Sequence, residues 1–267
     1  MWHSSRKSAR VTISRDCVTL FKREHVDGEH HPTRSEPLPD AASLAGALER
    51  CVGAETRALR MIVSDVYARF WITQPPANAT TKQDLRMSSR WRFEELFGEP
   101  ASSWNLQADW HAGRPFVACA IPLAITDVIA AVTSAMRIHV INCVPRFVAE
   151  WNVHRRALRS CNDAWFGVFA DSIVTLALVR RGEIAQIQRV PCPKNGPLDL
   201  EIVSTALRSM ALQAHDCRLV RVALCGDLPA QWEEARNGEF QFERIKVNLR
   251  PATAIALDTV ALAEQTQ

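Results

Sequence analysis

Glycine is the residue that most restricts this 267-residue chain, because there are only ten and the closest two, Gly46 and Gly53, are seven positions apart. Loops that cradle a phosphate, or that turn sharply to present a nucleophile, need closely spaced glycines, since a Cβ would block the turn or the ligand. The chain therefore has none of the local signatures of dinucleotide-binding, P-loop or nucleophile-elbow proteins.

The rest of the composition is typical of a folded protein. Apolar residues make up 47% and charged residues 23% of the chain, which allows a sizeable core and excludes disorder as the main state. The net charge of +3 is too small to favour nucleic acid as a partner. The longest apolar stretch, residues 116–132, is interrupted by Pro122 and Asp127 and is shorter than the roughly 20 residues of a membrane span. We therefore expect a cytoplasmic protein with no nucleic-acid partner and no direct membrane span.

The cysteines and histidines give no clear metal motif. The eight cysteines have no CxxC spacing, and several lie in apolar runs, which is typical of free buried thiols in a reducing compartment. The densest metal-capable group is Cys17, His25, His30 and His31. Only His25 and His30 have a spacing that suits zinc, and no second pair complements them. We expect a polar loop there and no bound metal.

The pattern of apolar residues predicts strands and helices mixed in both halves of the chain. In the first half it predicts strands at 10–21 (a pair), 59–63, 67–73, 104–110, 116–121 and 138–144, and a loop at 22–40. It predicts helices there at 41–52, at 81–97, from Thr126 or Asp127 to 137, and from Pro145 to about 159. In the second half it predicts a three-strand meander at 165–190, strands at 220–224 and 240–247, and helices at 198–215, from Pro229 and at 252–263. Because each half opens with antiparallel strands, the order favours a two-lobed α/β chain.

Tryptophan is unusually frequent, with eight residues against a single tyrosine. Five of them occupy apolar positions of their predicted elements, and we expect these in the core: Trp91, Trp104, Trp110, Trp151 and Trp165. The pattern does not assign Trp2 or Trp71. An aromatic side chain at an exposed position would be a candidate anchor for a partner protein. The basic run at 154–159 falls at a predicted helix C-terminus, where the helix dipole favours cations.

Several weak motifs occur in a recognisable order. They are the strand pair of residues 60–65 and 72–75, the acidic-aromatic segment 91–97, the strand Val-Ala-Cys-Ala-Ile-Pro at 117–122 and the helix start at 144–146. This order resembles the PilM-like and GspL-like proteins of type IV pilus and type II secretion systems, which include the MshI-type proteins. The resemblance extends from about residue 10 to residue 263. It implies a two-lobed actin-like ATPase (ribonuclease H-like) fold with mixed sheets flanked by helices. The lobes would comprise residues 1–159, with an insert at about 81–121, and residues 160–267.

The resemblance also implies where a nucleotide would bind. Actin-like ATPases hold the phosphates between two β-hairpins with Asp-x-Gly turns and the adenosine against a Gly-Gly loop. In this chain neither hairpin has the expected Asp or Gly, and the third loop has one glycine followed by an acid. The positions that depart from the family pattern are Thr12, Ser14, Val168, Ala170 and Asp227. We therefore expect no catalytic residues and no nucleotide cofactor.

A chain of this family without nucleotide chemistry is expected to act through its surface. The resemblance implies a non-catalytic cytoplasmic scaffold, peripheral to the inner membrane, that binds the cytoplasmic tail of an inner-membrane pilus or secretion subunit. The assembly ATPase is a second candidate partner. The expected contact residues lie in the insert and are Arg90, Trp91, Phe93, Phe97 and Trp110. Two alternatives remain open: an active ATPase or sugar kinase of the same fold, and a metal-dependent hydrolase that uses the histidine-rich segment.

Overall fold

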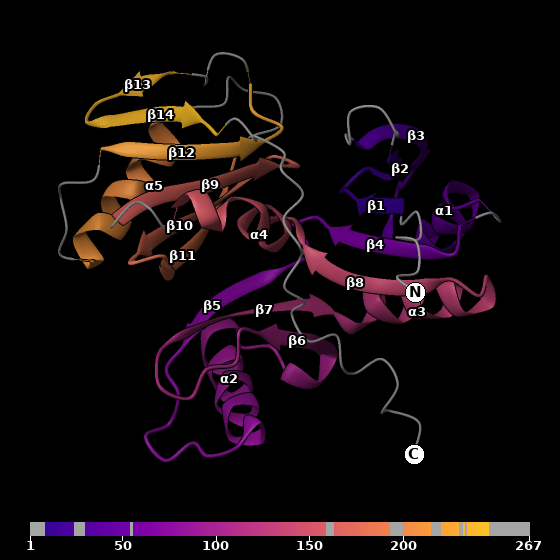
Figure 1. The fold of residues 1–267 in the computed structure, drawn as a ribbon, viewed down its shortest axis with the longest axis horizontal. Helices are drawn as coiled ribbons and strands as arrows, with labels where there is room; N and C mark the ends of the chain where they lie inside the picture. The colour runs from indigo at the N-terminus through magenta and orange to yellow at the C-terminus, as the bar shows by residue number, and fades with distance from the viewer. Residues whose placement is uncertain are drawn as a thin grey trace, which may run out of the picture.

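The computed structural model describes residues 9–23, 30–53, 56–158, 163–192, 200–214, 220–229, 232 and 234–245, and these residues form three sheets (Figure 1). The first sheet has the order β3-β2-β1-β4-β8. Its strands are β1 (Ala9–Ile13), β2 (Cys17–Arg23), β3 (His30–Pro37), β4 (Ala58–Val63) and β8 (His139–Pro145). The first three form an antiparallel meander, and β4 and β8 continue the sheet in parallel with β1.

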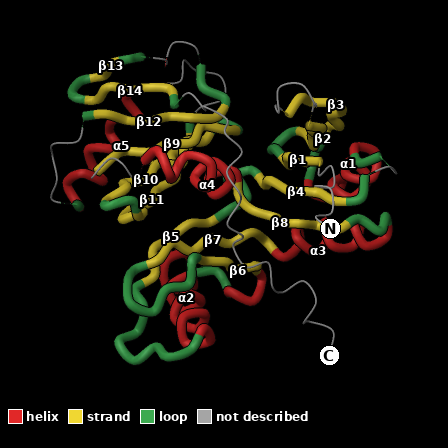
Figure 2. The backbone as a smooth tube through the Cα atoms, in the orientation of Figure 1, coloured by secondary structure: helices red, strands yellow, loops and turns green. Residues whose placement is uncertain are grey.

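Two helices cover the apolar side of the first sheet. They are α1 (Leu44–Cys51), preceded by the short helix η1 (Ala41–Ser43), and α3 (Leu123–Ala135). Leu48 of α1 and Ile129 of α3 pack with Val11 and Met61 of the sheet in one buried cluster. Figure 2 shows α1 and α3 beside the first sheet.

The second sheet repeats this plan. Its order is β11-β10-β9-β12-β14-β13, formed by β9 (Asp163–Ala170), β10 (Ile173–Arg180), β11 (Glu183–Pro191), β12 (Arg221–Gly226), β13 (Arg236–Asn237) and β14 (Phe240–Arg244). Again a three-strand antiparallel meander is followed by two parallel strands, β12 and β14. Helix α5 (Leu200–Gln213) packs on this sheet through Val203 and Leu207, and α4 (Arg146–Leu158) connects β8 to β9. The two lobes are therefore built on the same strand order.

A third, antiparallel sheet has the order β5-β7-β6. Its strands are β5 (Arg69–Thr73), β6 (Trp104–Ala108), which follows the short helix η2 (Ala101–Ser103), and β7 (Phe116–Pro122). Helix α2 (Lys82–Phe97) packs against this sheet, as Figure 2 shows. Thr81 and Asp84 form a capping box at the start of α2, and Gly98, with a φ of 65°, ends the helix in the left-handed conformation.

Most of the predicted elements are confirmed, but four differ. Residues 22–40 were predicted as a loop, yet they contain β3, an edge strand whose Pro32 sits beside a register shift, where a missing N–H is tolerated. Helix α3 begins at Leu123 instead of Thr126, because Pro122 precedes its first turn. The strands β4 and β5 belong to different sheets and do not form a pair. No α-helix follows Pro229 among the described residues up to 245.

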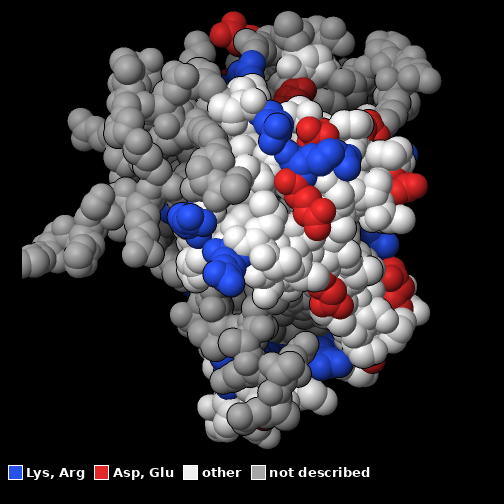
Figure 3. All heavy atoms as spheres, turned by 90° about the vertical axis from the view of Figure 1, so that its right-hand side faces the viewer, with Lys and Arg blue, Asp and Glu red and all other residues white. Residues whose placement is uncertain are grey.

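Some expectations lie outside the described residues: those for Trp2, His25 and the helix at 252–263. Within the described part of the chain, no helix is long and apolar enough to cross a membrane. On the face of the first lobe shown in Figure 3, the described cationic and anionic side chains are interspersed.

Candidate functional site

The turns of the two hairpins that would hold a nucleotide contact each other directly. The backbone N–H of Arg15, in the turn between β1 and β2, donates to Oδ2 of Asp171 in the turn between β9 and β10, at 3.3 Å. The hydroxyl of Tyr67 donates to the carbonyl oxygen of Arg15, at 3.4 Å. Asp171 and Ser172 both have positive φ angles, 52° and 62°, and so form a tight turn without glycine.

The side chains at the expected phosphate-binding positions of the two hairpins include no carboxylate that could position a metal or a water. Thr12 is 6% exposed, Val168 is completely buried in the core beside α4, and Ala170 is 6% exposed. The N–H of Ser14 donates to the carbonyl of Cys17 within its own hairpin, at 2.9 Å, and is not available to a phosphate. The predicted departures from the family pattern therefore fall on residues that pack or pair within the protein.

The loop after β12 uses its glycine for packing. Gly226 has a φ of 96°, and a Cβ at this position would lie 2.1 Å from the carbonyl oxygen of Phe169. The N–H of Asp227 donates to the same oxygen at 2.9 Å. The carboxylate of Asp227 is largely exposed and lies 3.8 Å from the guanidinium of Arg146. Glycine here allows β12 to approach the end of β9, and no ligand is needed to explain it.

A buried carboxyl group, Asp65, joins the two lobes. It follows β4 and accepts the N–H of Phe147 at the start of α4 (3.0 Å) and the hydroxyl of Thr175 on β10 (2.8 Å). Its carbonyl oxygen accepts from Nη1 of Arg189 on β11 (2.8 Å). Burial raises the pKa of Asp65 to about 6, although these hydrogen bonds oppose the rise. Asp65 is not among the site residues predicted from the sequence, where its only signal is an acid directly after a buried strand.

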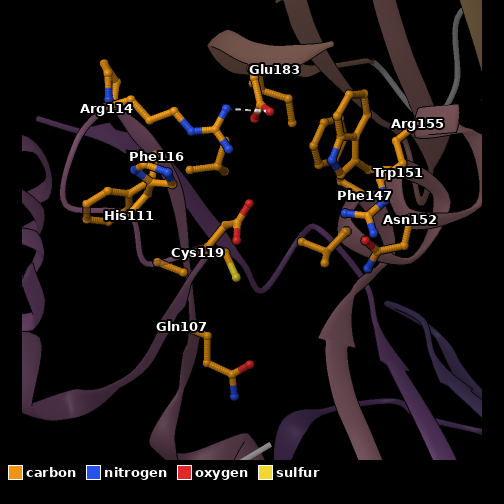
Figure 4. A pocket seen from close by; sticks show the side chains of 16 residues that line it. Gln107, His111, Arg114, Phe116, Cys119, Phe147, Trp151, Asn152, Arg155 and Glu183 are labelled. Atoms are coloured by element: carbon orange, nitrogen blue, oxygen red, sulfur yellow. Dashed lines mark ion pairs between the residues drawn. The ribbon is translucent and has the colours of Figure 1, made fainter. Parts of the chain in front are cut away.

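A central cavity of about 130 Å³ lies between the third sheet, α4 and the start of β11. Figure 4 shows His111, Arg114 and Phe116 on one side of it and Phe147, Trp151 and Asn152 on the other. The ion pair between Arg114 and Glu183, at 2.6 Å, connects the loop between β6 and β7 to the second sheet. The ring of Trp110 packs on Phe116, with centroids 5.7 Å apart.

A larger groove of about 820 Å³ lies between α2 and the second lobe, and we call it the α2 groove. It is lined by 70–74 of β5, by Ser88, Trp91, Arg92, Leu96 and Phe97 of α2, by 185–188 of β11, and by Met210 and Gln213 of α5. Trp91 is 67% exposed and Leu96 is 45% exposed, although both are large and apolar. Met87, one turn before Trp91 on the same helix, is 56% exposed. Exposed apolar groups clustered in this way mark interaction surfaces.

The five predicted contact residues do not form one site. Trp91 and Phe97 line the α2 groove, Arg90 is exposed on α2 outside the lining, and Trp110 lies beside the central cavity. Phe93 has no exposed surface, since its ring packs among those of Trp71, Phe97 and Trp104, so it supports the groove from below and cannot contact a partner.

The tryptophans divide between the core and the surface. The expectation that Trp91 belongs to the core is wrong, because its side chain is 67% exposed on the wall of the α2 groove. Trp165, at 1% exposure, is buried as predicted, and Trp104, Trp110 and Trp151 are half-buried.

Among the described residues, Glu150, His154 and Cys225 bring three potential ligand atoms together, and none of the three was considered as a metal ligand from the sequence. Of the histidine-rich segment, His25 lies outside the described residues, and Cys17 contacts the hydroxyl of Thr19 at 3.6 Å. Arg155 and Arg156 lie in the last turn of α4, as the helix dipole predicts, whereas His154 is buried.

No protein-family model and no curated protein sequence matches the chain. Solved structures do. A Bacteroides thetaiotaomicron protein of actin-like ATPase fold and unknown function matches with a TM-score of 0.58 and 10% identity over 85% of each chain. A PilM-PilN type IV pilus biogenesis complex matches with a TM-score of 0.59 and 11% identity over 84% of this chain and 82% of the other. The cytoplasmic domain of EpsL, an inner-membrane component of the Vibrio cholerae type II secretion system, matches with a TM-score of 0.55 and 10% identity over 90% of each. The chain therefore has the two-lobed actin-like ATPase fold, as the resemblance implied.

Proposed function

We propose that this protein is a non-catalytic scaffold that binds a short cytoplasmic segment of an inner-membrane subunit, in a type IV pilus or a type II secretion system, through the α2 groove. The machine is suggested by two of the similar structures, one a pilus biogenesis complex and one the cytoplasmic domain of an inner-membrane secretion component. By the same analogy we place the protein in the cytoplasm, attached to the membrane through its partners. The assembly ATPase remains the second candidate partner.

The contacts and residues of the two hairpins that would hold a nucleotide support a non-catalytic role. Phosphoryl transfer needs donors aimed at the phosphates and an acidic group for the metal or the attacking water. Here the turn N–H of Arg15 is bonded to Asp171, and Thr12 and Val168 occupy the positions of the expected acids. No observation favours an active ATPase or kinase over this proposal.

The observation that carries the choice of site is the exposure of Trp91, 67% of a large aromatic side chain on the wall of a groove. Leu96 and Phe97 extend the apolar wall on the same helix, and Arg92, whose Nη1 donates to Oε2 of Glu95 at 2.6 Å, also lines the groove. Peptide grooves commonly gain affinity from one or two such apolar anchors and orientation from the polar groups around them.

Two sheet edges meet at the groove. Strand β5 is an edge of the third sheet and β11 is an edge of the second sheet, and the two strands lie close to each other without belonging to one sheet. In addition, two buried polar atoms of groove-lining residues, Nε1 of Trp71 and Oε1 of Gln186, have no hydrogen-bond partner in the described part of the protein.

The proposal is tested with synthetic peptides that cover the cytoplasmic segments of the inner-membrane subunits encoded beside this protein. We expect one peptide to bind the wild-type protein and to bind Trp91→Ser at least about tenfold more weakly, because an anchor contact is lost. Leu212→Ser is the matched control, since Leu212 is 69% exposed on α5 but does not line the groove.

Arg114→Ala gives the test a second arm, because it opens the ion pair at the central cavity and leaves the α2 groove intact. Binding that is lost in Arg114→Ala and retained in Trp91→Ser would place the site in the central cavity. If no peptide binds the wild-type protein, the scaffold proposal itself fails.

A further inference from the structure

Three side chains with metal-binding atoms converge where α4 meets the second sheet. Glu150 and His154 are four residues apart on α4, so they project from the same face of the helix. Cys225 comes from β12. Oxygen, nitrogen and sulfur atoms of the three residues all lie within 4.8 Å of one another.

His154 gives an independent indication of a ligand. Its side chain is only 4% exposed, yet Nε2 has no hydrogen-bond partner among the described residues. Oε2 of Glu150 lies 3.7 Å from Nε2, which is too far for a hydrogen bond. Because buried polar atoms are nearly always paired, the unpaired nitrogen points to a ligand that the described residues do not supply.

The surroundings of Glu150 favour coordination by one of its oxygens. Oε1 accepts a hydrogen bond from Nε of Arg146 at 2.8 Å, while Oε2 is the atom that faces His154. A hydrogen bond of this kind orients carboxylate ligands in many metal sites. Glutamate and a cysteine thiolate together contribute two negative charges, which a divalent cation neutralises. The nearby Arg146 remains paired with Glu150 and with Asp227.

We propose that Glu150, His154 and Cys225 form a zinc site. Zinc accepts carboxylate, imidazole and thiolate ligands in a tetrahedral arrangement, and three protein ligands leave its fourth position to water. Ligand bonds of about 2.0–2.3 Å place the donor atoms about 3.5 Å apart, so the cluster contracts by about 1 Å when the ion binds. The ion ties α4, the helix that connects the two lobes, to β12 in the second sheet.

Cobalt titration of the metal-free protein, in the presence of a phosphine reductant, tests the site. We expect one Co²⁺ per chain, a thiolate-to-cobalt charge-transfer band in the near ultraviolet, and loss of that band when Zn²⁺ is added. Cys225→Ser should abolish the band. His154→Phe keeps a ring against Phe166 and removes the nitrogen, and it should weaken the affinity at least about tenfold. Cys192→Ser is the matched control, because Cys192 is also buried in the second lobe but lies outside the cluster.

The outcomes separate this site from others on the chain. Cobalt that binds without the charge-transfer band, or a band that survives in Cys225→Ser, would place the metal elsewhere and overturn the proposal. Absence of binding at millimolar cobalt would also overturn it. If Cys225→Ser does not fold, as judged by circular dichroism, His154→Phe and Glu150→Gln carry the test, and unchanged affinity in both would contradict the site.

Discussion

At the scale of single residues, Asp65 shows how this fold connects its lobes. Its carboxylate bonds to α4 and to β10, and its backbone bonds to β11, so a single residue contacts three elements. The charge is held where water does not reach, which favours the protonated form and raises the pKa to about 6 from an ordinary value of 3.8. Asp65 therefore fixes the geometry between the lobes at a cost in free energy at neutral pH.

This cost predicts that the free energy of unfolding depends on pH. Because the pKa is raised in the folded state, the stabilisation by Asp65 is fully present below pH 3.8 and is lost as the pH rises towards about 6. In Asp65→Asn the amide can accept from Phe147 and donate to Thr175, so both hydrogen bonds survive without a charge. The free energy of unfolding of Asp65→Asn relative to wild type should rise by up to about 3 kcal/mol between pH 4 and pH 7.5. Urea unfolding at a series of pH values measures the difference, and a constant difference would contradict the burial of the charge.

At the scale of elements, α2 carries apolar residues on two sides. Leu85 and Phe93 are buried, and Phe93 packs with Trp71 and Ala118 of the third sheet, whereas Met87 and Trp91 are exposed. A helix that only needed to cover its sheet would have polar residues on the outer side. The second apolar side is the structural basis for the proposed partner site.

The two sides of α2 should respond differently to mutation. Phe93→Ala removes a completely buried ring and should lower the free energy of unfolding by about 3–5 kcal/mol. Trp91→Ser changes an exposed residue and should alter stability by no more than about 0.5 kcal/mol. Chemical denaturation of both variants checks the pair. A large loss of stability in Trp91→Ser would mean that Trp91 packs within the protein and is not available as an anchor.

Elements with a strong local pattern could be predicted from the sequence, and those defined by distant contacts could not. The strand pair β1–β2, the meander β9–β11 and the helices α1, α2, α4 and α5 follow apolar periodicity or capping residues. Strand β3 has almost no apolar alternation, because an edge strand needs only its pairing with β2. The same limit applies to the sites: the exposure of Trp91 depends on what α2 packs against, and the convergence of His154 with Cys225 depends on the contact of α4 with β12.

At the scale of the whole molecule, the structure has the actin-like plan, and contacts at its centre join the two lobes. The five strands of the first sheet and the first five of the second have the same order, and similar solved structures confirm the fold. Between the lobes, however, Arg15 and Asp171 join the two hairpin turns, and Asp65 joins α4 to the second sheet. Neither of the two cavities described above includes the hairpin turns. The partner site that we propose lies instead in the α2 groove, beside the third sheet.

Calorimetric titration with Mg²⁺-ATP tests most directly whether the space between the two hairpin turns can still bind a nucleotide. The hairpin contact, the buried Thr12 and Val168 and the missing turn glycines predict no saturable binding, with a Kd weaker than about 1 mM, or about −4 kcal/mol. The titration is made on protein whose fold has been checked by circular dichroism. A Kd in the low micromolar range, about −8 kcal/mol, would show that a nucleotide site is present. It would contradict the non-catalytic scaffold and favour the alternative of an active ATPase or sugar kinase.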